Sequence, residues 1–311
     1  MMSDYLLKNG KVLLFQPNKD KIDVTIEEKE ILVQKGKIVK IETIIEKNQY
    51  PNAEGIDATN CVIMPGLINT HAHIPMSLFR ESTEGCKLYD WLENKIWPQE
   101  DKLTEEDVYY ASMLSFIEMI STGTTCINDQ YFLQDAIRKA AEDMGVRAVL
   151  TRTVIGEKEE AEKRIAEFRK FYETRDKQND LITYTVAPHS LYTCSPEALQ
   201  MTADLAKELN LPIHVHFLES VDEIEDIKQK QGEKASKVLK KYFDGIHTIL
   251  AHAVHLDDED IAILKTMDCG IAHNPVSNLR LGCTIADTTK YLQNNLNVAL
   301  RNRWTRFTVA I

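Results

Sequence analysis

Residues 61–73 read Cys61-Val62-Ile63-Met64-Pro65-Gly66-Leu67-Ile68-Asn69-Thr70-His71-Ala72-His73. The part up to Thr70 is apolar, contains β-branched residues and is bounded by turn formers, which predicts a buried strand that ends in a loop. Residues two apart on a strand point to the same side, so His71 and His73 are expected to converge. Two imidazoles at such a place suit a metal ion, and the alternative is two unrelated polar residues at a strand end.

Beyond this first strand, the sequence alternates between short apolar runs and helical patterns. Buried strands are predicted at 62–69, 124–128, 146–151, 181–187, 212–217, 247–251, 270–272 and 297–300. Helices are predicted at 104–121, 132–144, 157–174, 196–209, 219–242, 257–267 and 284–294. Eight strands alternating with helices over about 250 residues predict a (β/α)8 TIM-like barrel, an α/β fold. A doubly wound open sheet is the alternative, but no Gly-rich phosphate loop follows any of these strands.

The first 60 residues differ from the rest because they contain short strand patterns and turn residues. The candidate strands are 5–7, 11–15, 24–26, 30–33 and 37–41, punctuated by Gly10, Pro17-Asn18 and Gly36. A meander of this size has edges that need covering, so we expect residues 1–60 to be part of a small β-sandwich whose partner strands lie elsewhere. Residues 61–311 would form the barrel domain.

The composition limits the function classes. The 311-residue chain has 43% hydrophobic residues and a net charge of −11, with no block of Lys and Arg, so a nucleic-acid surface is not expected. No apolar stretch reaches the roughly 18 residues of a membrane span, and no signal peptide is evident. Six scattered cysteines without a C-x-x-C pair suit a reducing compartment, so we expect a cytoplasmic protein. The oligomeric state, monomer or homo-oligomer, stays open.

The histidines cluster where a barrel places its chemistry, at the carboxyl ends of strands. Eight of the nine histidines lie at or within a few residues of such an end: His71, His73, His189, His214, His216, His252, His255 and His273. The ninth, His247, begins the sixth strand and is expected to be structural. A single histidine at a strand end is more often a hydrogen-bonded structural residue, but eight of them predict a metal site.

Chemical roles can be assigned to part of this set. His71, His73 and His216 can supply three nitrogens to a divalent metal that keeps one position open for water, and metal-bound water becomes a nucleophile near neutral pH. Glu219, three residues after His216, is placed to shuttle a proton. Its alternative role is to stabilise the first turn of the acidic helix that follows. His252 can orient the activated water.

Four stretches carry a resemblance to a known family. They are Met64 to His73, Ala187-Pro188-His189, Ile213-His214-Val215-His216-Phe217-Leu218-Glu219 and His273-Asn274-Pro275. From about residue 5 to residue 300 the chain resembles the amidohydrolase superfamily. Within it, the chain is most similar to the 5-methylthioadenosine/S-adenosylhomocysteine deaminases, which are related to triazine hydrolases and guanine deaminase.

The resemblance implies one metal ion, zinc or iron, on His71, His73 and His216, with Glu219 as proton shuttle and His252 beside the nucleophile. Histidine-rich sites also accept manganese. The implied reaction is hydrolytic deamination of an adenosine-type nucleoside, in which water attacks the amino-bearing carbon and ammonia leaves. The alternatives are another amino- or chloro-substituted ring, such as guanine or a triazine, and an inactive fragment.

Substrate contacts implied by the resemblance are Glu100, Arg152, Arg164 and His189. From the residues alone, Glu100 is equally a helix cap, Arg152 a surface ion pair and Arg164 a solvated side chain. Trp91, Ile96 and Trp97 form either an apolar lid or part of the core. The charged run from Glu219 to Lys241 is interpreted as a solvated pair of helices.

The chain departs from the family after Leu300. The family has an aspartate there, in Gly-Thr-Asp-Gly, which binds the metal, whereas this chain reads Arg301-Asn302-Arg303-Trp304. Codons for residues 301–307 can be chosen that encode Gly-Thr-Asp-Gly when read one base out of frame. We therefore expect the chain to be truncated by a frameshift after Leu300, to lack the closing strands of the sandwich, to be poorly soluble and to have little or no activity.

Overall fold

The structure, a computed structural model, describes residues 3–18, 21–80 and 85–300. They form two compact units that divide after Gly66. The predicted departure of residues 301–311 from the family pattern lies outside the described residues. Among the helices of the described part, none is long and apolar enough to cross a membrane.

The first unit is a sheet in the strand order β3-β2-β1-β4, with β5 also paired to β1. Its strands are β1 (Tyr5–Asn18), β2 (Lys21–Gln34), β3 (Lys37–Glu42), β4 (Glu54–Asp57) and β5 (Val62–Ile63), and a short 3-10 helix, η1, spans Lys47–Gln49. A small core forms around Leu6, Leu32 and Ile45. Large apolar side chains are also exposed in this unit, among them Ile22, Val24, Ile26 and Ile38.

The predicted strands of the first 60 residues were wrong in two respects. The expected strands 5–7 and 11–15 form one strand, β1, the expected strands 24–26 and 30–33 form β2, and β4 was not predicted. Gly10 does not end a strand. It lies inside β1 at a register shift between Leu7 and Gly10, where the strand pairs with β2. Glycine inside a strand often marks such a bulge.

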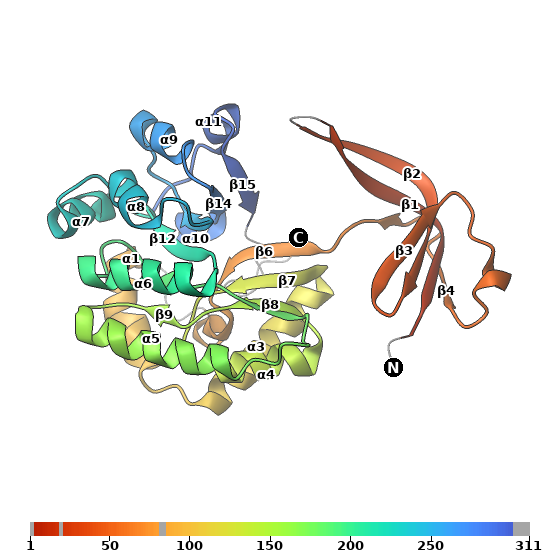
Figure 1. Cartoon of the computed structure of the whole chain (residues 1–311), viewed down its shortest axis with the longest axis horizontal. Coiled ribbons are helices and arrows are strands. Elements are labelled where there is room, and N and C mark those ends of the chain that lie inside the picture. Colours follow the sequence, from red (N-terminus) through yellow and green to blue (C-terminus); the bar gives the residue numbers. More distant parts are fainter. Residues whose placement is uncertain (1–2, 19–20, 81–84, 301–311) are drawn as a thin grey trace. The chain divides into compact units, whose positions relative to one another are not determined.

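The second unit contains the eight predicted barrel strands (Figure 1). They are β6 (Leu67–Ala72), β7 (Thr124–Asp129), β8 (Arg147–Leu150), β10 (Ile182–Tyr184), β12 (Ile213–Phe217), β13 (Thr248–His252), β14 (Cys269–His273) and β15 (Asn297–Leu300). Two short strands, β9 (Thr153–Val154) and β11 (Ala187–Pro188), pair with each other and continue the third and fourth barrel strands. All of these pairings are parallel.

The strands close into a ring. One sheet runs β10-β8-β7-β6 and another β12-β13-β14-β15. Parallel bridges from Val186 to Ile213 and from Ser190 to His216 join them on one side. On the other side, the Thr70 hydroxyl of β6 donates to the Leu300 carbonyl of β15 at 3.0 Å. The second unit is therefore a (β/α)8 barrel, as predicted.

The helices between these strands are also largely as predicted. They are α3 (Glu105–Ser121), α4 (Gln134–Met144), α5 (Lys158–Glu173), α6 (Pro196–Leu209), α7 (Val221–Gln231), α8 (Ala235–Phe243), α9 (Asp258–Leu264) and α11 (Thr288–Gln293). Local chemistry sets where several of them begin. Thr104 and Asp107 form a capping box at α3, and Ser195 caps α6 ahead of Pro196.

Short helices were missed by the sequence patterns. They are η2 (Ile74–Phe79), α1 (Leu88–Trp91), η3 (Leu92–Ile96), α2 (Trp97–Glu100) and α10 (Pro275–Arg280). Each spans six residues or fewer, too short for a helical period to show. Their positions directly after the first strand and after β14 matter because both segments contribute to the site.

Two further expectations need correction. The predicted strand 62–69 is split: Val62–Ile63 pairs with β1, the barrel strand begins at Leu67, and Leu67 and Ile68 are exposed rather than buried. Pro65, which has no backbone N–H to donate to a ladder, lies in the break. The run from Glu219 to Lys241 does form two helices, but they are not simply solvated, because Ile227, Val238 and Leu239 are buried in the core.

Candidate active site

Four histidine rings meet at the carboxyl ends of three barrel strands. His71 lies on β6, His73 follows it, His216 lies on β12 and His252 ends β13. The ring of His71 is 4.8 Å from those of His73 and His216, and 5.3 Å from that of His252. The convergence expected of His71 and His73 is therefore present.

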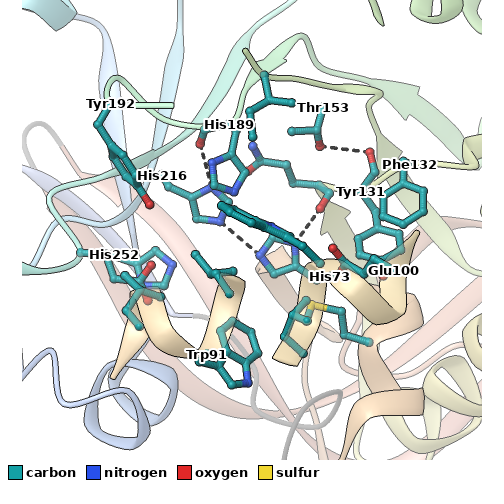
Figure 2. A pocket seen from close by; sticks show the side chains of 18 of the residues that line it. His73, Trp91, Glu100, Tyr131, Phe132, Thr153, His189, Tyr192, His216 and His252 are labelled. Atoms are coloured by element: carbon teal, nitrogen blue, oxygen red, sulfur yellow. Dashed lines mark hydrogen bonds and ion pairs between the residues drawn. The ribbon is translucent and has the colours of Figure 1, made fainter. Parts of the chain in front are cut away.

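Backbone carbonyls fix the tautomers of two of these rings. His73 Nδ1 lies 2.6 Å from the Gln130 carbonyl oxygen, and His216 Nδ1 lies 2.7 Å from that of His189. A carbonyl only accepts, so both Nδ1 atoms carry a proton, and in a neutral ring of this tautomer Nε2 is the nitrogen that can bind a metal. These two Nε2 atoms face each other at 3.1 Å (Figure 2).

This spacing fits a metal ion. Two nitrogens bound at about 2.0–2.1 Å in a tetrahedral zinc site lie roughly 3.3 Å apart. Burial and the neighbouring histidines lower the pKa of His216 well below its usual value, so its imidazole is neutral, which is the form that binds metal. The donor set and its protonation therefore suit a divalent ion.

A second grouping of ligand atoms overlaps the first. One ligand atom each from His71, His216 and His252 lie within 4.8 Å of one another, and all three residues are buried. His71 Nδ1 is also 2.9 Å from Nε2 of His214, which is buried as well. The choice between His73 and His252 as third ligand therefore stays a prediction.

Glu219 and His252 form a pair beside these rings. His252 Nδ1 lies 2.7 Å from Asn278 Oδ1 and 3.1 Å from Glu219 Oε1. Glu219 is buried, with 7% of its surface exposed. It precedes α7, whose cap is Ser220, so Glu219 is not in the helical turn that the alternative interpretation required.

These groups open into one cavity of about 380 Å³. Its walls include His73, His216, His252 and Glu219 and all four predicted substrate residues, Glu100, Arg152, Arg164 and His189. Figure 2 shows His189 and Glu100 on the same cavity as His73 and His216. Residues from six strand ends and from helices α2 and α5 are thus brought together.

The two arginines are neither purely surface ion pairs nor fully solvated. Arg152 Nε donates to Glu167 at 2.7 Å and Arg164 Nε donates to Glu160 at 2.6 Å, and both side chains line the cavity. Burial, aided by Arg164, lowers the pKa of His189 to about 4. His189 is therefore a neutral hydrogen-bonding group at physiological pH.

The segment after the first strand supplies an apolar wall. Trp91 and Ile96 are almost fully buried and belong to the core, while Trp97 is partly exposed. All three line the cavity. Trp91 and Ile96 are therefore core residues that also form part of the cavity wall, and the lid role stays a prediction.

Several cavity residues were not predicted from the sequence: Tyr131, Phe132, Tyr192, Gln130 and Glu223. The Ser220-x-x-Glu223 spacing in the sequence marks the start of a helix, but it does not place Glu223 in a cavity. Four other histidines lie at or near strand ends but are not among the residues that line the cavity: the predicted ligand His71, and His214, His255 and His273. His247 lies at the surface and contacts Asp268 at 2.9 Å, in keeping with its expected structural role.

Comparison with known proteins agrees with this architecture. The sequence pattern of the Amidohydrolase family matches residues 62–301. A 5'-deoxyadenosine deaminase of Methanococcus maripaludis (strain C7) is 42% identical over 280 residues, covering 88% of this chain and 66% of that protein. A 5-methylthioadenosine/S-adenosylhomocysteine deaminase of Carboxydothermus hydrogenoformans is 42% identical over 299 residues, covering 95% and 67%. The chain thus spans about two thirds of the length of these relatives.

A solved structure gives the same result for the fold. An adenosine deaminase from Xanthomonas campestris with bound zinc superposes with a TM-score of 0.82 at 25% identity, over 96% of this chain and 68% of that one. The resemblance predicted from the motifs is therefore confirmed. The match over residues 62–301 and the relatives at 42% identity show that the chain belongs to the amidohydrolase family.

Proposed function

We propose that this chain carries the apparatus for metal-dependent hydrolytic deamination of adenosine-type nucleosides, to the inosine analogue and ammonia. The names of the relatives point to 5'-deoxyadenosine, 5-methylthioadenosine and S-adenosylhomocysteine as substrates. The observation that carries the proposal is the meeting of the His73 and His216 Nε2 atoms with the Glu219–His252 pair in one cavity. The scattered, unpaired cysteines favour a cytoplasmic setting for this reaction.

His71, His73 and His216 would hold one divalent ion, which we take to be zinc, with iron or manganese as the alternatives. When bound, such an ion activates a water molecule as nucleophile near neutral pH. The carbonyls of Gln130 and His189 keep the rings of His73 and His216 in the ligand tautomer. These two contacts orient both rings with Nε2 toward the proposed metal position.

Glu219 would move a proton from the attacking water to a purine ring nitrogen. Its burial next to His252 places the carboxylate within hydrogen-bond distance of a second proton-carrying group. General acid–base groups of this kind contribute about 10²–10⁴-fold to rate. His252, held by Asn278, would orient the water.

Substrate recognition would fall to the opposite wall. The cationic Arg152 and Arg164 suit a polar or anionic substituent, and the neutral imidazole of His189 suits a base or ribose atom. Glu100 can accept from ribose hydroxyls. The apolar segment around Trp91 and Trp97 would exclude bulk water from the reacting ring.

The test is an assay of two chains side by side. One is the 311-residue chain, and the other carries Arg301→Gly, Asn302→Thr, Arg303→Asp and Trp304→Gly, which installs the family's acidic ligand. Each is analysed for bound metal and for ammonia released from 5'-deoxyadenosine, 5-methylthioadenosine, S-adenosylhomocysteine, adenosine and guanine.

We expect the substituted chain to deaminate the adenosine-type nucleosides and the original chain to be much slower. If ammonia is released from guanine alone, the substrate is guanine and not an adenosine-type nucleoside. If metal binds and neither chain deaminates any of these compounds, the proposed function is wrong.

A further inference from the structure

Glu223 is a buried carboxylate that the proposed reaction does not use. Only 1% of its surface is exposed, although it lies in the first turn of a charged helix, α7. Its Oε1 accepts from the Leu218 backbone N–H at 2.9 Å, and its Oε2 accepts from that of Glu219 at 2.7 Å. Both carboxylate oxygens are therefore bound to the two residues that follow β12.

This arrangement departs from an ordinary helix cap. In a capping box, the glutamate reaches back to the N–H of the cap residue itself. Here the Ser220 hydroxyl accepts from the Glu223 N–H at 3.3 Å, as a cap does. The Glu223 side chain, however, passes Ser220 and binds the turn that carries Glu219. Sealing the helix end does not explain this geometry.

The turn that Glu223 binds contains a residue with an unfavourable backbone conformation. Leu218 has a φ of 48°, in the left-handed region that a branched side chain rarely adopts. Such conformations persist only where surrounding contacts hold them. The Leu218 carbonyl oxygen accepts from the Val254 N–H at 3.0 Å, which ties the turn to the loop after His252. The Glu223 carboxylate holds the same peptide units from the other side.

We propose that Glu223 is a positioning residue, whose carboxylate holds the Leu218–Glu219 turn so that the Glu219 side chain faces His252. The effect on rate rests on the proposed function, because it requires Glu219 to be the proton shuttle. The hold of Glu223 on the turn does not depend on that function. The distance at stake is the 3.1 Å between Glu219 Oε1 and His252 Nδ1. Displacement of a catalytic group by about 1 Å can cost about 10²-fold in rate.

The test is made at pH 8, above the pKa of about 7 to which burial raises the Glu223 carboxyl. It begins with Glu223→Gln, which keeps the size of the side chain but turns one acceptor into an amide donor. One of the two backbone N–H groups then loses its partner. We expect amide hydrogen exchange at Leu218 or Glu219 to accelerate by about 10-fold or more. In the more active of the two chains described above, kcat should fall by about 10- to 100-fold, with KM changed less than about 3-fold and metal content unchanged.

Two control variants separate positioning from general damage. Asp260→Asn alters another buried carboxylate in a first helical turn, which accepts from the Asp257 N–H at 3.1 Å in α9. Glu225→Gln removes an exposed charge from α7 itself. Both should leave kcat within about 2-fold of the parent, even if Asp260→Asn lowers the melting temperature. Glu223→Asp keeps two acceptor oxygens on a shorter side chain. Its kcat and its amide exchange at Leu218 and Glu219 should lie between those of the parent and those of Glu223→Gln. It replaces Glu223→Gln in the test if that variant does not fold.

Unchanged exchange at Leu218 and Glu219 in the Glu223 variants would overturn the proposal. So would faster exchange with an unchanged kcat, or an equal loss of kcat in Asp260→Asn. If no chain deaminates a nucleoside, the proposed function fails, and the exchange measurement still decides whether Glu223 holds the turn.

Discussion

The Nε2 atoms of His73 and His216 lie 3.1 Å apart, while the Nδ1 atom of each ring donates to a backbone carbonyl. A neutral imidazole bound in this way points the lone pair of its Nε2 atom at the neighbouring ring. Such a contact between buried groups is unfavourable unless a proton or a cation lies between the nitrogens. Burial lowers the pKa of His216, which disfavours the proton. This arrangement supports our proposal that a divalent cation binds between the two rings.

Replacement of one of these rings should remove the metal. Loss of a group that only hydrogen-bonds to a metal ligand weakens metal binding by about 10- to 100-fold. We expect His216→Ala to weaken it more than this, because the substitution removes a ligand itself. Metal content after dialysis against a chelator measures this. His247→Ala, which alters an exposed histidine away from the cavity, is the control and should keep the parent's metal content.

The third ligand can be decided in the same way. If His73 is a ligand and His252 orients the water, His73→Ala should lose metal, whereas His252→Ala should keep metal and lose activity. The compact group of His71, His216 and His252 predicts the reverse. We expect the first outcome, since the His73 tautomer is fixed for metal binding by Gln130. Metal retained in His73→Ala and lost in His252→Ala would assign His252 as the ligand.

Glu219 should matter for rate rather than for metal binding. Glu219→Gln keeps the shape of the side chain but cannot accept and release a proton, so we expect kcat for ammonia release to fall by about 10²–10⁴-fold. Metal content and thermal stability should stay near those of the parent. An undiminished kcat in this variant would remove Glu219 from the mechanism.

The barrel could be predicted because most of its strands are short apolar runs followed by a longer helical period. The run from Ile213 to Phe217 and the helix that begins at Val221 are clear examples. The break at Pro65 was missed because an apolar sequence on both sides of a proline resembles one strand. The six-residue helix α10, which carries Asn278, has no period to detect.

The site could be predicted only as far as strand ends could be placed. His71, His73, His216 and His252 converge because barrel topology brings their strand ends to one face. Glu223 and Tyr192 could not be assigned, since their side chains reach the cavity from a helix turn and a loop. That placement depends on tertiary packing, which no local pattern encodes.

The cationic wall of the cavity should affect substrate binding. Arg152 uses its Nε on Glu167 and one terminal nitrogen on the Thr153 carbonyl, out of five N–H donors. We expect Arg152→Gln to raise KM by about 10-fold for a nucleoside with a charged 5' substituent, equal to about 1.4 kcal/mol of binding, and by less for 5'-deoxyadenosine. Arg169→Gln, which breaks a surface pair with Glu208, is the matched control and should leave both KM values unchanged.

Glu223 should also give the protein a specific dependence of stability on pH. Burial raises the pKa of its carboxyl to about 7, from 4.5 in the unfolded chain. The folded state then binds more protons than the unfolded state between pH 4.5 and 7. The contribution is therefore fully present below pH 4.5 and is lost as the pH rises through 7. A shift of this size corresponds to roughly 3 kcal/mol.

Glutamine cannot ionise, so the free energy of unfolding of the parent should fall relative to that of Glu223→Gln between pH 5 and pH 8. Denaturant unfolding across this range measures the difference, with Glu225→Gln expected to follow the parent. Parallel curves for the parent and Glu223→Gln would show that Glu223 stays ionised in the folded protein, held by the N–H groups of Leu218 and Glu219.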